Sequence, residues 1–316
     1  MDLLKIIRAK ISMLAPGDYI PGLEAVLIHL EAGNRHWLRG QESADDTLFT
    51  DVIYRTNQAF EGALKEAYRV LAKKDPSKRT PSDIESYLQT QKVFRQRILS
   101  QITNYRMEWR NPSTHDYKLD FDEGEAFLAI VTVCAFFSLL LDQVAEELAS
   151  EAAKAQANAQ KDTILEELAG RPKLALADRV ANLLSHFTVQ LNEDKRKRHQ
   201  ISEVELTGAV SGFLSAIEPN MEVLIEPHVG PDGLERPDLI VYEDNTQVIV
   251  ELKRTKPSDQ NIEQSVSQMA RYLAATGVRE GVVYFFYSQN TGTFVRTERS
   301  LPGIQGRIIV TYTEPA

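Results

Sequence analysis

The sequence predicts two domains, an all-helical bundle followed by a smaller α/β domain. Three observations support this multidomain fold class. The chain has 316 residues, enough for two ordinary domains, and 43% of them are hydrophobic, enough for a buried core in each. Over about the first two thirds of the chain, apolar residues recur at helical spacing. After about residue 200, short apolar runs of strand length replace that pattern.

The helical domain is predicted over residues 1–150. Helical spacing of apolar residues indicates helices at residues 1–13, 22–32, 46–72, 80–109 and from about 122 past 141. Gly33 is expected to end the second of them. Pro112 is expected to stop the fourth and to open a break at residues 110–121.

Residues 151–197 are predicted to form a helical connector. The stretch that leads into it, "EELASEAAKAQANAQKD", is rich in Ala, Glu, Gln and Lys, so it favours helix but offers little apolar surface to bury. We therefore expect this segment to be solvated. An amphipathic helix follows at about residues 175–191.

The α/β domain is predicted over residues 198–316. Helices are expected at residues 202–217 and 258–277, and strands at 221–229, 238–242, 247–253, 281–288 and 307–313. Gly277 is expected to end the second helix. The predicted order is therefore helix, three strands, helix and two strands.

The composition predicts a soluble, cytoplasmic protein that does not span a membrane. Cys134 is the single cysteine and cannot form an internal disulfide, which is typical of a reducing compartment. The N-terminus lacks a signal-peptide layout. The longest apolar stretch, residues 126–141, is shorter than a membrane span and is expected to be a buried helix. A net charge of −9 argues against a broad nucleic-acid-coating surface, but it allows a local one.

Charged residues stand at the ends of two apolar runs in the α/β domain. Side chains alternate across a strand, so Glu251 and Lys253 should share a face. The polar turn at residues 243–247 lets the two strands fold back on each other, which brings Asp238 near Glu251. Two adjacent carboxylates repel each other unless a cation lies between them. Oxygen ligands suit Mg²⁺ or Mn²⁺, and Lys253 could then orient a metal-activated water or a phosphate.

The pattern Pro237-Asp238, twelve residues, then Glu251-x-Lys253 resembles the signature of the PD-(D/E)XK nucleases. The resemblance covers roughly residues 200–316. It implies an αβββαβ core like that of restriction endonucleases. It also implies metal-dependent hydrolysis of phosphodiester bonds. DNA is the favoured substrate and RNA is the alternative.

Two flanking features extend this resemblance. Family members often carry a metal-binding acid on the first helix. Glu203 is the candidate, because Glu205 fits a capping box with Ser202 and lies further from the buried helix face. Gln268 and Tyr272 resemble the Gln-x-x-x-Tyr motif of the exonuclease-like branch, and one helical turn puts them on one face. The resemblance implies contact with DNA or with the motif lysine.

The helical domain carries a second motif. Arg110 and His115 flank a four-residue spacer that starts with Asn111, which resembles the Arg-x(4–6)-His motif of HEPN domains. The stretch 57–68 also resembles a HEPN helix, and the resemblance covers roughly residues 20–145. HEPN domains include metal-independent RNases that act in pairs, so the resemblance implies a homodimer. Histidine can move a proton from a ribose hydroxyl and arginine can hold a phosphate.

Three functions follow as hypotheses. The first is a metal-dependent nuclease, acting in prokaryotic anti-phage defence as families of this kind often do. The second is a metal-independent HEPN RNase of the toxin or abortive-infection type, with the C-terminal domain as a nucleic-acid reader. The third is a dimeric binding adaptor without catalysis.

Overall fold

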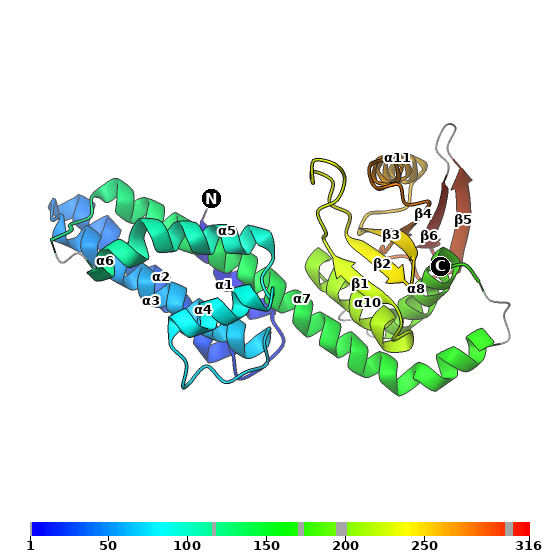
Figure 1. Cartoon of the computed structure of the whole chain (residues 1–316), viewed down its shortest axis with the longest axis horizontal. Helices are drawn as coiled ribbons and strands as arrows, with labels where there is room; N and C mark the ends of the chain where they lie inside the picture. The colour runs from blue at the N-terminus through cyan, green and yellow to red at the C-terminus, as the bar shows by residue number, and fades with distance from the viewer. Residues whose placement is uncertain (1, 116–117, 170–173, 194–200, 301–305) are drawn as a thin grey trace. The chain divides into compact units, whose positions relative to one another are not determined.

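The computed structural model describes residues 2–115, 118–169, 174–193, 201–300 and 306–316. The chain divides into two compact units, Met1–Glu147 and Leu148–Ala316. The first unit is helical and the second combines helices with a six-stranded mixed sheet (Figure 1).

The first unit is a bundle of helices around an aromatic core. Its helices are α1 (Leu3–Met13), α2 (Ile20–Ser43), α3 (Thr47–Val70), α4 (Pro81–Thr90), α5 (Gln96–Tyr105), η1 (Arg106–Arg110), α6 (Asn111–His115) and the first part of α7 (Glu123–Ala169). Phe60 of α3 stacks between Tyr105 and Phe136, with ring centroids 4.9 and 5.2 Å apart. Such tilted pairs add specific attraction to the burial of large rings.

Two predicted helix boundaries in this unit were wrong. Gly33 does not end α2, because it is buried against α3, where a Cβ would lie 3.6 Å from the Cβ of Arg55. Helix α2 continues past Gly33 and ends at Ser43, where the C-cap residue Ala44 takes a left-handed conformation. The predicted helix 80–109 is interrupted between α4 and α5, where Lys92 has a φ of 52°.

Pro112 does not stop the helix, contrary to the prediction. The chain widens into a π-helix at Arg106–Arg110, where the Asn111 amide donates to the Arg106 carbonyl five residues back. A π-helix already breaks the regular α-helical ladder, so the missing N–H of Pro112 costs little there. The hydroxyls of Ser113 and Thr114 donate to the Arg110 carbonyl, and α6 continues to His115.

Helix α7 confirms the predicted buried helix at residues 126–141. Side chains that lie in the core of the first unit include Ala126, Ala129, Val133, Phe136, Phe137 and Leu140. By length and composition alone, Glu123–Glu167 could cross a membrane. However, half of its most apolar window is buried inside the protein, as in a core helix.

The segment predicted as a solvated connector, residues 151–197, belongs to the second unit. Ala153, Ala157 and Ile164 of α7 are buried in its core, and so is most of the apolar face of α8 (Leu176–Glu193). Helix α10 (Glu203–Ile217) packs closely on the α7 backbone through Gly212. A Cβ on Gly212 would lie 2.2 Å from the Ser150 carbonyl oxygen. Most of the other residues in 151–163 are exposed, as predicted, and composition does not distinguish the two buried alanines from their exposed neighbours.

The second unit is a mixed sheet between two layers of helix. Its further elements are β1 (Glu222–Ile225), β2 (Leu239–Glu243), β3 (Thr246–Lys253), α11 (Asp259–Thr276), β4 (Glu280–Phe285), β5 (Phe294–Ser300) and β6 (Arg307–Thr313). The strand order is β1-β2-β3-β4-β6-β5, with β3, β4 and β6 parallel. Helix α11 covers one face, and α8, α10 and the end of α7 cover the other (Figure 1).

The predicted order of helix, three strands, helix and strand is confirmed, with two corrections at its strands. The strand predicted at 221–229 ends at Ile225, because Glu226 takes a left-handed conformation with a φ of 46°. Strand β5 was not predicted. Its sequence, "FVRTERS", is polar and half exposed, as suits an edge strand.

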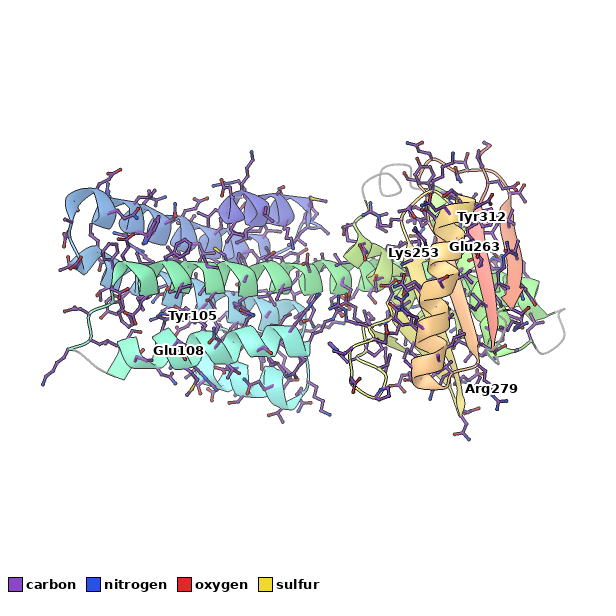
Figure 2. All side chains as sticks on the ribbon, turned by 90° about the horizontal axis from the view of Figure 1, so that it is seen from above. Tyr105, Glu108, Lys253, Glu263, Arg279 and Tyr312 are labelled. Atoms are coloured by element: carbon purple, nitrogen blue, oxygen red, sulfur yellow. The ribbon has the colours of Figure 1, made fainter. Side chains whose placement is uncertain are left out.

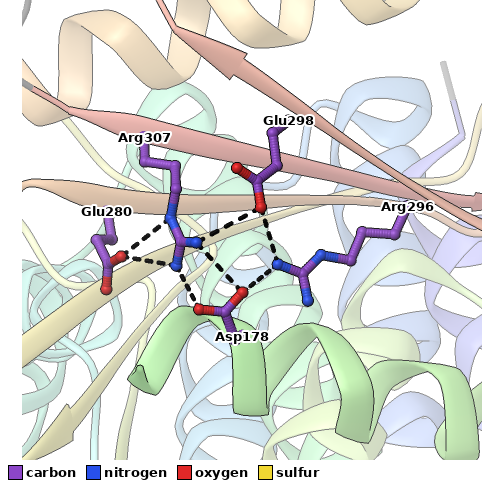
Figure 3. A network of polar contacts seen from close by, with 5 residues as sticks. All are labelled: Asp178, Glu280, Arg296, Glu298 and Arg307. Atoms are coloured by element: carbon purple, nitrogen blue, oxygen red, sulfur yellow. Dashed lines mark hydrogen bonds and ion pairs between the residues drawn. The ribbon is translucent and has the colours of Figure 1, made fainter. Parts of the chain in front are cut away.

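A charged network fastens this edge strand (Figure 3). Asp178 of α8 pairs with Arg296 of β5 and with Arg307 of β6, the latter at 2.6 Å. Glu280 of β4 lies 2.8 Å from the same Arg307. Burial opposes ionisation of Asp178, but the hydrogen bonds from the two arginines outweigh it and hold the pKa of this carboxyl below its ordinary value.

Asp178→Ala is expected to destabilise the second unit by about 1–3 kcal/mol, because the two partly buried guanidinium groups lose the most buried of their carboxylate partners. Hydrogen exchange of β5 and β6 amides measures this loss. Glu298→Ala is the matched control, since the Glu298 side chain in the same network is 52% exposed and should cost under about 1 kcal/mol. Equal losses for the two variants would contradict the central role of Asp178.

Candidate functional site

The pairing of β2 with β3 positions two carboxylates together. The antiparallel register joins Leu239 to Val250, so the next position sets Asp238 opposite Glu251. The Leu252 amide donates to Asp238 Oδ2 at 2.6 Å. The Asp238 amide lies 3.5 Å from Glu251 Oε2. Both acids are therefore held at the same end of the sheet by backbone geometry.

Strand alternation then brings Lys253 into the same group. Ile249 packs in the core on the α11 side, so Glu251 and Lys253 face α11 as well. Lys253 Nζ lies 2.7 Å from Glu251 Oε1 and 2.9 Å from Gln268 Oε1. Figure 2 shows Lys253 beside α11, with Arg279 at the opposite end of the same helix.

Helix α11 supplies two further polar groups, Gln268 and Tyr272, which lie one turn apart. Gln268 Nε2 donates to Glu251 Oε1 at 2.9 Å and to the Tyr272 hydroxyl oxygen at 2.6 Å. The Tyr272 hydroxyl in turn donates to the Arg236 carbonyl at 3.4 Å. The structure thus brings Gln268 into direct contact with Lys253, and Tyr272 supports Gln268.

The site carries more negative charge than its lysine compensates. Burial, followed by the charge of Glu251, raises the pKa of Asp238 to about 7. Burial also raises the pKa of Glu251, although the hydrogen bond from Lys253 opposes this. Burial and the nearby Glu251 raise the pKa of the Tyr272 hydroxyl. A cation between the two carboxylates would relieve this repulsion.

The metal-free protein is expected to lose stability as pH rises. The pKa of Asp238 is higher in the folded chain than in the unfolded one, so the folded state binds the proton more tightly. The stabilisation is complete below about pH 4 and is lost as pH rises to about 7. We expect a loss of about 1–3 kcal/mol in the second unit between pH 5 and 7.5.

Hydrogen exchange of β2 and β3 amides at the two pH values, in EDTA, measures this loss. The matched control is Asp238→Asn, which cannot ionise and should lose less. Trp37 and Trp109 both lie in the first unit, so their fluorescence reports whether that unit is unaffected. An equal pH dependence in both proteins would show that Asp238 is not the titrating group.

Glu203 and Glu205 behave differently at the start of α10. Glu205 forms the predicted capping box, in which the Ser202 amide donates to Glu205 Oε2 at 2.7 Å. Glu203 is exposed, and its charge makes the smallest contribution to the raised pKa of Asp238. Within the described ranges, no three His, Cys, Asp or Glu side chains lie close enough to hold one metal ion. The role of Glu203 as a metal ligand stays a prediction.

The remaining donor set, Asp238 and Glu251, fits a hard divalent cation. Mg²⁺ commonly takes one or two carboxylates and keeps several of its water ligands. Burial first, and then the neighbouring charge of Glu251, raise the pKa of Asp238, and a bound cation would favour its ionised form. These two residues would hold the ion.

The second predicted pair, Arg110 and His115, is only partly described. Arg110 Nη2 lies 3.4 Å from Glu61 Oε1. Together with Arg106, Arg110 lines a cavity of about 230 Å³ beside α3 and α4. His115 is the last residue of α6, and its side chain lies outside the described residues. The structure therefore shows a partner for the arginine but gives no geometry for the pair.

Sequence reasoning missed two backbone groups of the candidate site. The Leu252 amide fixes Asp238, and the Arg236 carbonyl anchors Tyr272. Residue identity carries no signal for such contacts, because they depend on how strands and helices pack.

No family model matches the chain, and neither a curated protein nor a solved structure was found to resemble it.

Proposed function

We propose that the second unit is a metal-dependent nuclease that hydrolyses phosphodiester bonds. DNA is the substrate we favour over RNA. The single observation that carries this proposal is the contact of Lys253 with Glu251 and Gln268, beside the paired Asp238. Two carboxylates, an ammonium and an amide at one sheet end form a set suited to a divalent cation and a phosphate. The order of elements supports a PD-(D/E)XK core.

Each residue of the set has a distinct role in the proposed reaction. When bound, Mg²⁺ or Mn²⁺ would lower the pKa of a coordinated water and offset charge on the phosphate. Asp238 and Glu251 hold the ion. Lys253 donates a hydrogen bond that orients the attacking water or a phosphate oxygen, and Gln268 keeps the ammonium aimed at the site. Tyr272 fixes the amide of Gln268.

Exposed cations next to the site suit a local nucleic-acid contact despite the net charge of −9. Arg254 and Lys256 directly follow Lys253, and both are exposed. Arg271, also exposed, follows Gln268 by one helical turn. Cationic side chains of this kind bind phosphates irrespective of sequence.

One observation favours the competing function, a metal-independent RNase in the helical unit. Arg110 lines a cavity, and its side-chain contacts to Glu61 and Asn111 are long, at 3.4 and 3.3 Å, so a phosphate could displace the Glu61 carboxylate. The HEPN assignment and the homodimer remain proposals that rest on the Arg110–His115 motif, and the defence setting is a proposal that rests on both family resemblances.

A digest of DNA and of RNA with the full chain, with Mg²⁺ or with EDTA, tests the proposal. The nuclease predicts DNA cleavage that EDTA abolishes. The competing RNase predicts RNA cleavage that survives EDTA and is lost in His115→Ala. If neither nucleic acid is cut under any metal condition, the binding adaptor is favoured.

A further inference from the structure

The segment between β1 and β2 is an ordered loop beside the candidate site. The Glu226 amide donates to the Asp238 carbonyl at 2.8 Å, and the Val229 amide donates to the Glu235 carbonyl at 2.9 Å. The loop therefore closes on itself directly before the first carboxylate of the site. Gly230 and Gly233, with φ of 84° and 61°, make the turn that other residues would take only with strain.

Helix α11 holds this loop in place. A Cβ on Gly230 would lie 3.3 Å from the Cβ of Ala275, so the loop backbone packs closely on the helix. The Tyr272 hydroxyl donates to the Arg236 carbonyl. Within the loop, His228 Nδ1 lies 2.9 Å from the Gly233 carbonyl oxygen. These contacts make the loop a preorganised element that shares an anchor, Tyr272, with the proposed catalytic set.

This anchored loop presents Leu234 to solvent. Leu234 is 83% exposed, more than any other large hydrophobic side chain within the described ranges. The four residue steps from Leu234 to Asp238 span at most about 14 Å when extended. Leu234 therefore lies within about four nucleotide steps, each roughly 3.4 Å, of a phosphate bound at Asp238.

We propose that Leu234 is a positioning residue that inserts against a nucleobase next to the cleaved phosphate. This inference rests on the proposed nuclease function and names how its substrate is engaged. Apolar wedges such as leucine unstack a base step when proteins present them to a duplex. Leu234 would thus open a duplex locally and bring one strand to Asp238.

The chemistry of the loop favours contact with a nucleobase over contact with the phosphate backbone or with a protein partner. Asp232, Glu235 and Arg236 lie within two residues of Leu234, so the loop tip has no excess of positive charge for a phosphate backbone, and its apolar side chain is left for the base stack. A protein partner would need a contiguous apolar patch of several hundred Å². Leu234 is a single large apolar side chain among charged neighbours, which does not form such a patch.

Fluorescence of 2-aminopurine tests the proposal. The full chain carrying Asp238→Asn binds duplexes that contain the probe base at successive positions from one end. We expect a rise in fluorescence at one or two adjacent positions, where the base is unstacked. With Leu234→Ala added, the rise should fall at least about fivefold, and Leu234→Met should restore it because a flexible apolar side chain still inserts.

The matched control is Val189→Ala on α8, which removes another exposed apolar side chain, 61% exposed, and should leave the signal unchanged. In the cleaving protein, Leu234→Ala should lower kcat on duplex DNA about 10–100-fold, with KM within about threefold. Its effect on single-stranded DNA should be much smaller.

The outcomes separate this proposal from the proposed function. If the 2-aminopurine fluorescence depends on Leu234 but the protein cleaves no nucleic acid, the base contact is supported and the nuclease function is contradicted. Cleavage and fluorescence that are both unchanged in Leu234→Ala overturn the base contact alone. If Leu234→Ala changes only the oligomeric mass in light scattering, the residue serves a protein contact and the proposal is wrong.

Discussion

Asp238→Asn is expected to lower the rate of DNA cleavage by about 10³–10⁴-fold. The substitution keeps the shape of the side chain and the acceptor for the Leu252 amide, but it removes the negative charge that a divalent cation needs. Loss of the metal removes several kcal/mol of transition-state stabilisation, and each 1.36 kcal/mol is tenfold in rate. The rate of plasmid nicking in Mg²⁺ measures the effect.

Asp259→Asn provides the matched control, because Asp259 is exposed and begins α11 away from the carboxylate pair. It should cut like the wild type. Asp238→Asn should also stay folded, since it removes the repulsion that raises the pKa of Asp238. A folded Asp238→Asn protein that cuts within tenfold of the wild-type rate would rule out Asp238 as a metal ligand.

Lys253→Met is expected to lower the cleavage rate by about 10²–10⁴-fold while metal binding persists. The ammonium contacts Glu251 and Gln268, so its removal takes away the group that donates to the water or the phosphate. Without Lys253, Glu251 loses its own cation and becomes a stronger ligand for an added one. Cleavage rate and metal affinity, measured on the same variant, should therefore change in opposite directions.

Lys256→Met controls for the general loss of a positive charge near the site. Lys256 is exposed three residues later, and its loss should weaken DNA binding modestly without abolishing cleavage. Lys253→Arg keeps the charge but not the compact ammonium, so it should recover little activity. If Lys253→Met cuts DNA normally, the lysine serves only to stabilise Glu251.

The local geometry of the candidate site was predictable because it depends on strand periodicity. Alternation along β3 places Glu251 and Lys253 on one face, and the tight turn between β2 and β3 brings Asp238 opposite Glu251. The capping box at Ser202 and the helix end at Gly277 were equally predictable, since both depend on a few neighbouring residues.

The errors arose where contacts between distant segments decide the structure. Gly33 was predicted to end a helix, but α2 continues through this residue, which packs against α3. Most of the Ala-rich stretch is exposed, as predicted, but Ala153 and Ala157 are buried in the core of the second unit. Strand β5 is polar along its length, and only pairing with β6 makes it a strand. None of these pairings leaves a periodic signal in the sequence.

Titration of the metal-free full chain with Mn²⁺ at pH 8, followed by the electron paramagnetic resonance signal of the free ion, tests the central claim most directly. At this pH, Asp238 is ionised whether or not an ion is bound, since its pKa is raised only to about 7. We predict saturable Mn²⁺ binding by the wild type, competed by Mg²⁺, that weakens at least about tenfold in Asp238→Asn and in Glu251→Gln. It should persist in Lys253→Met. Absence of Mn²⁺ binding in the wild type, or equal binding in the carboxylate variants, would contradict a metal site at Asp238 and Glu251.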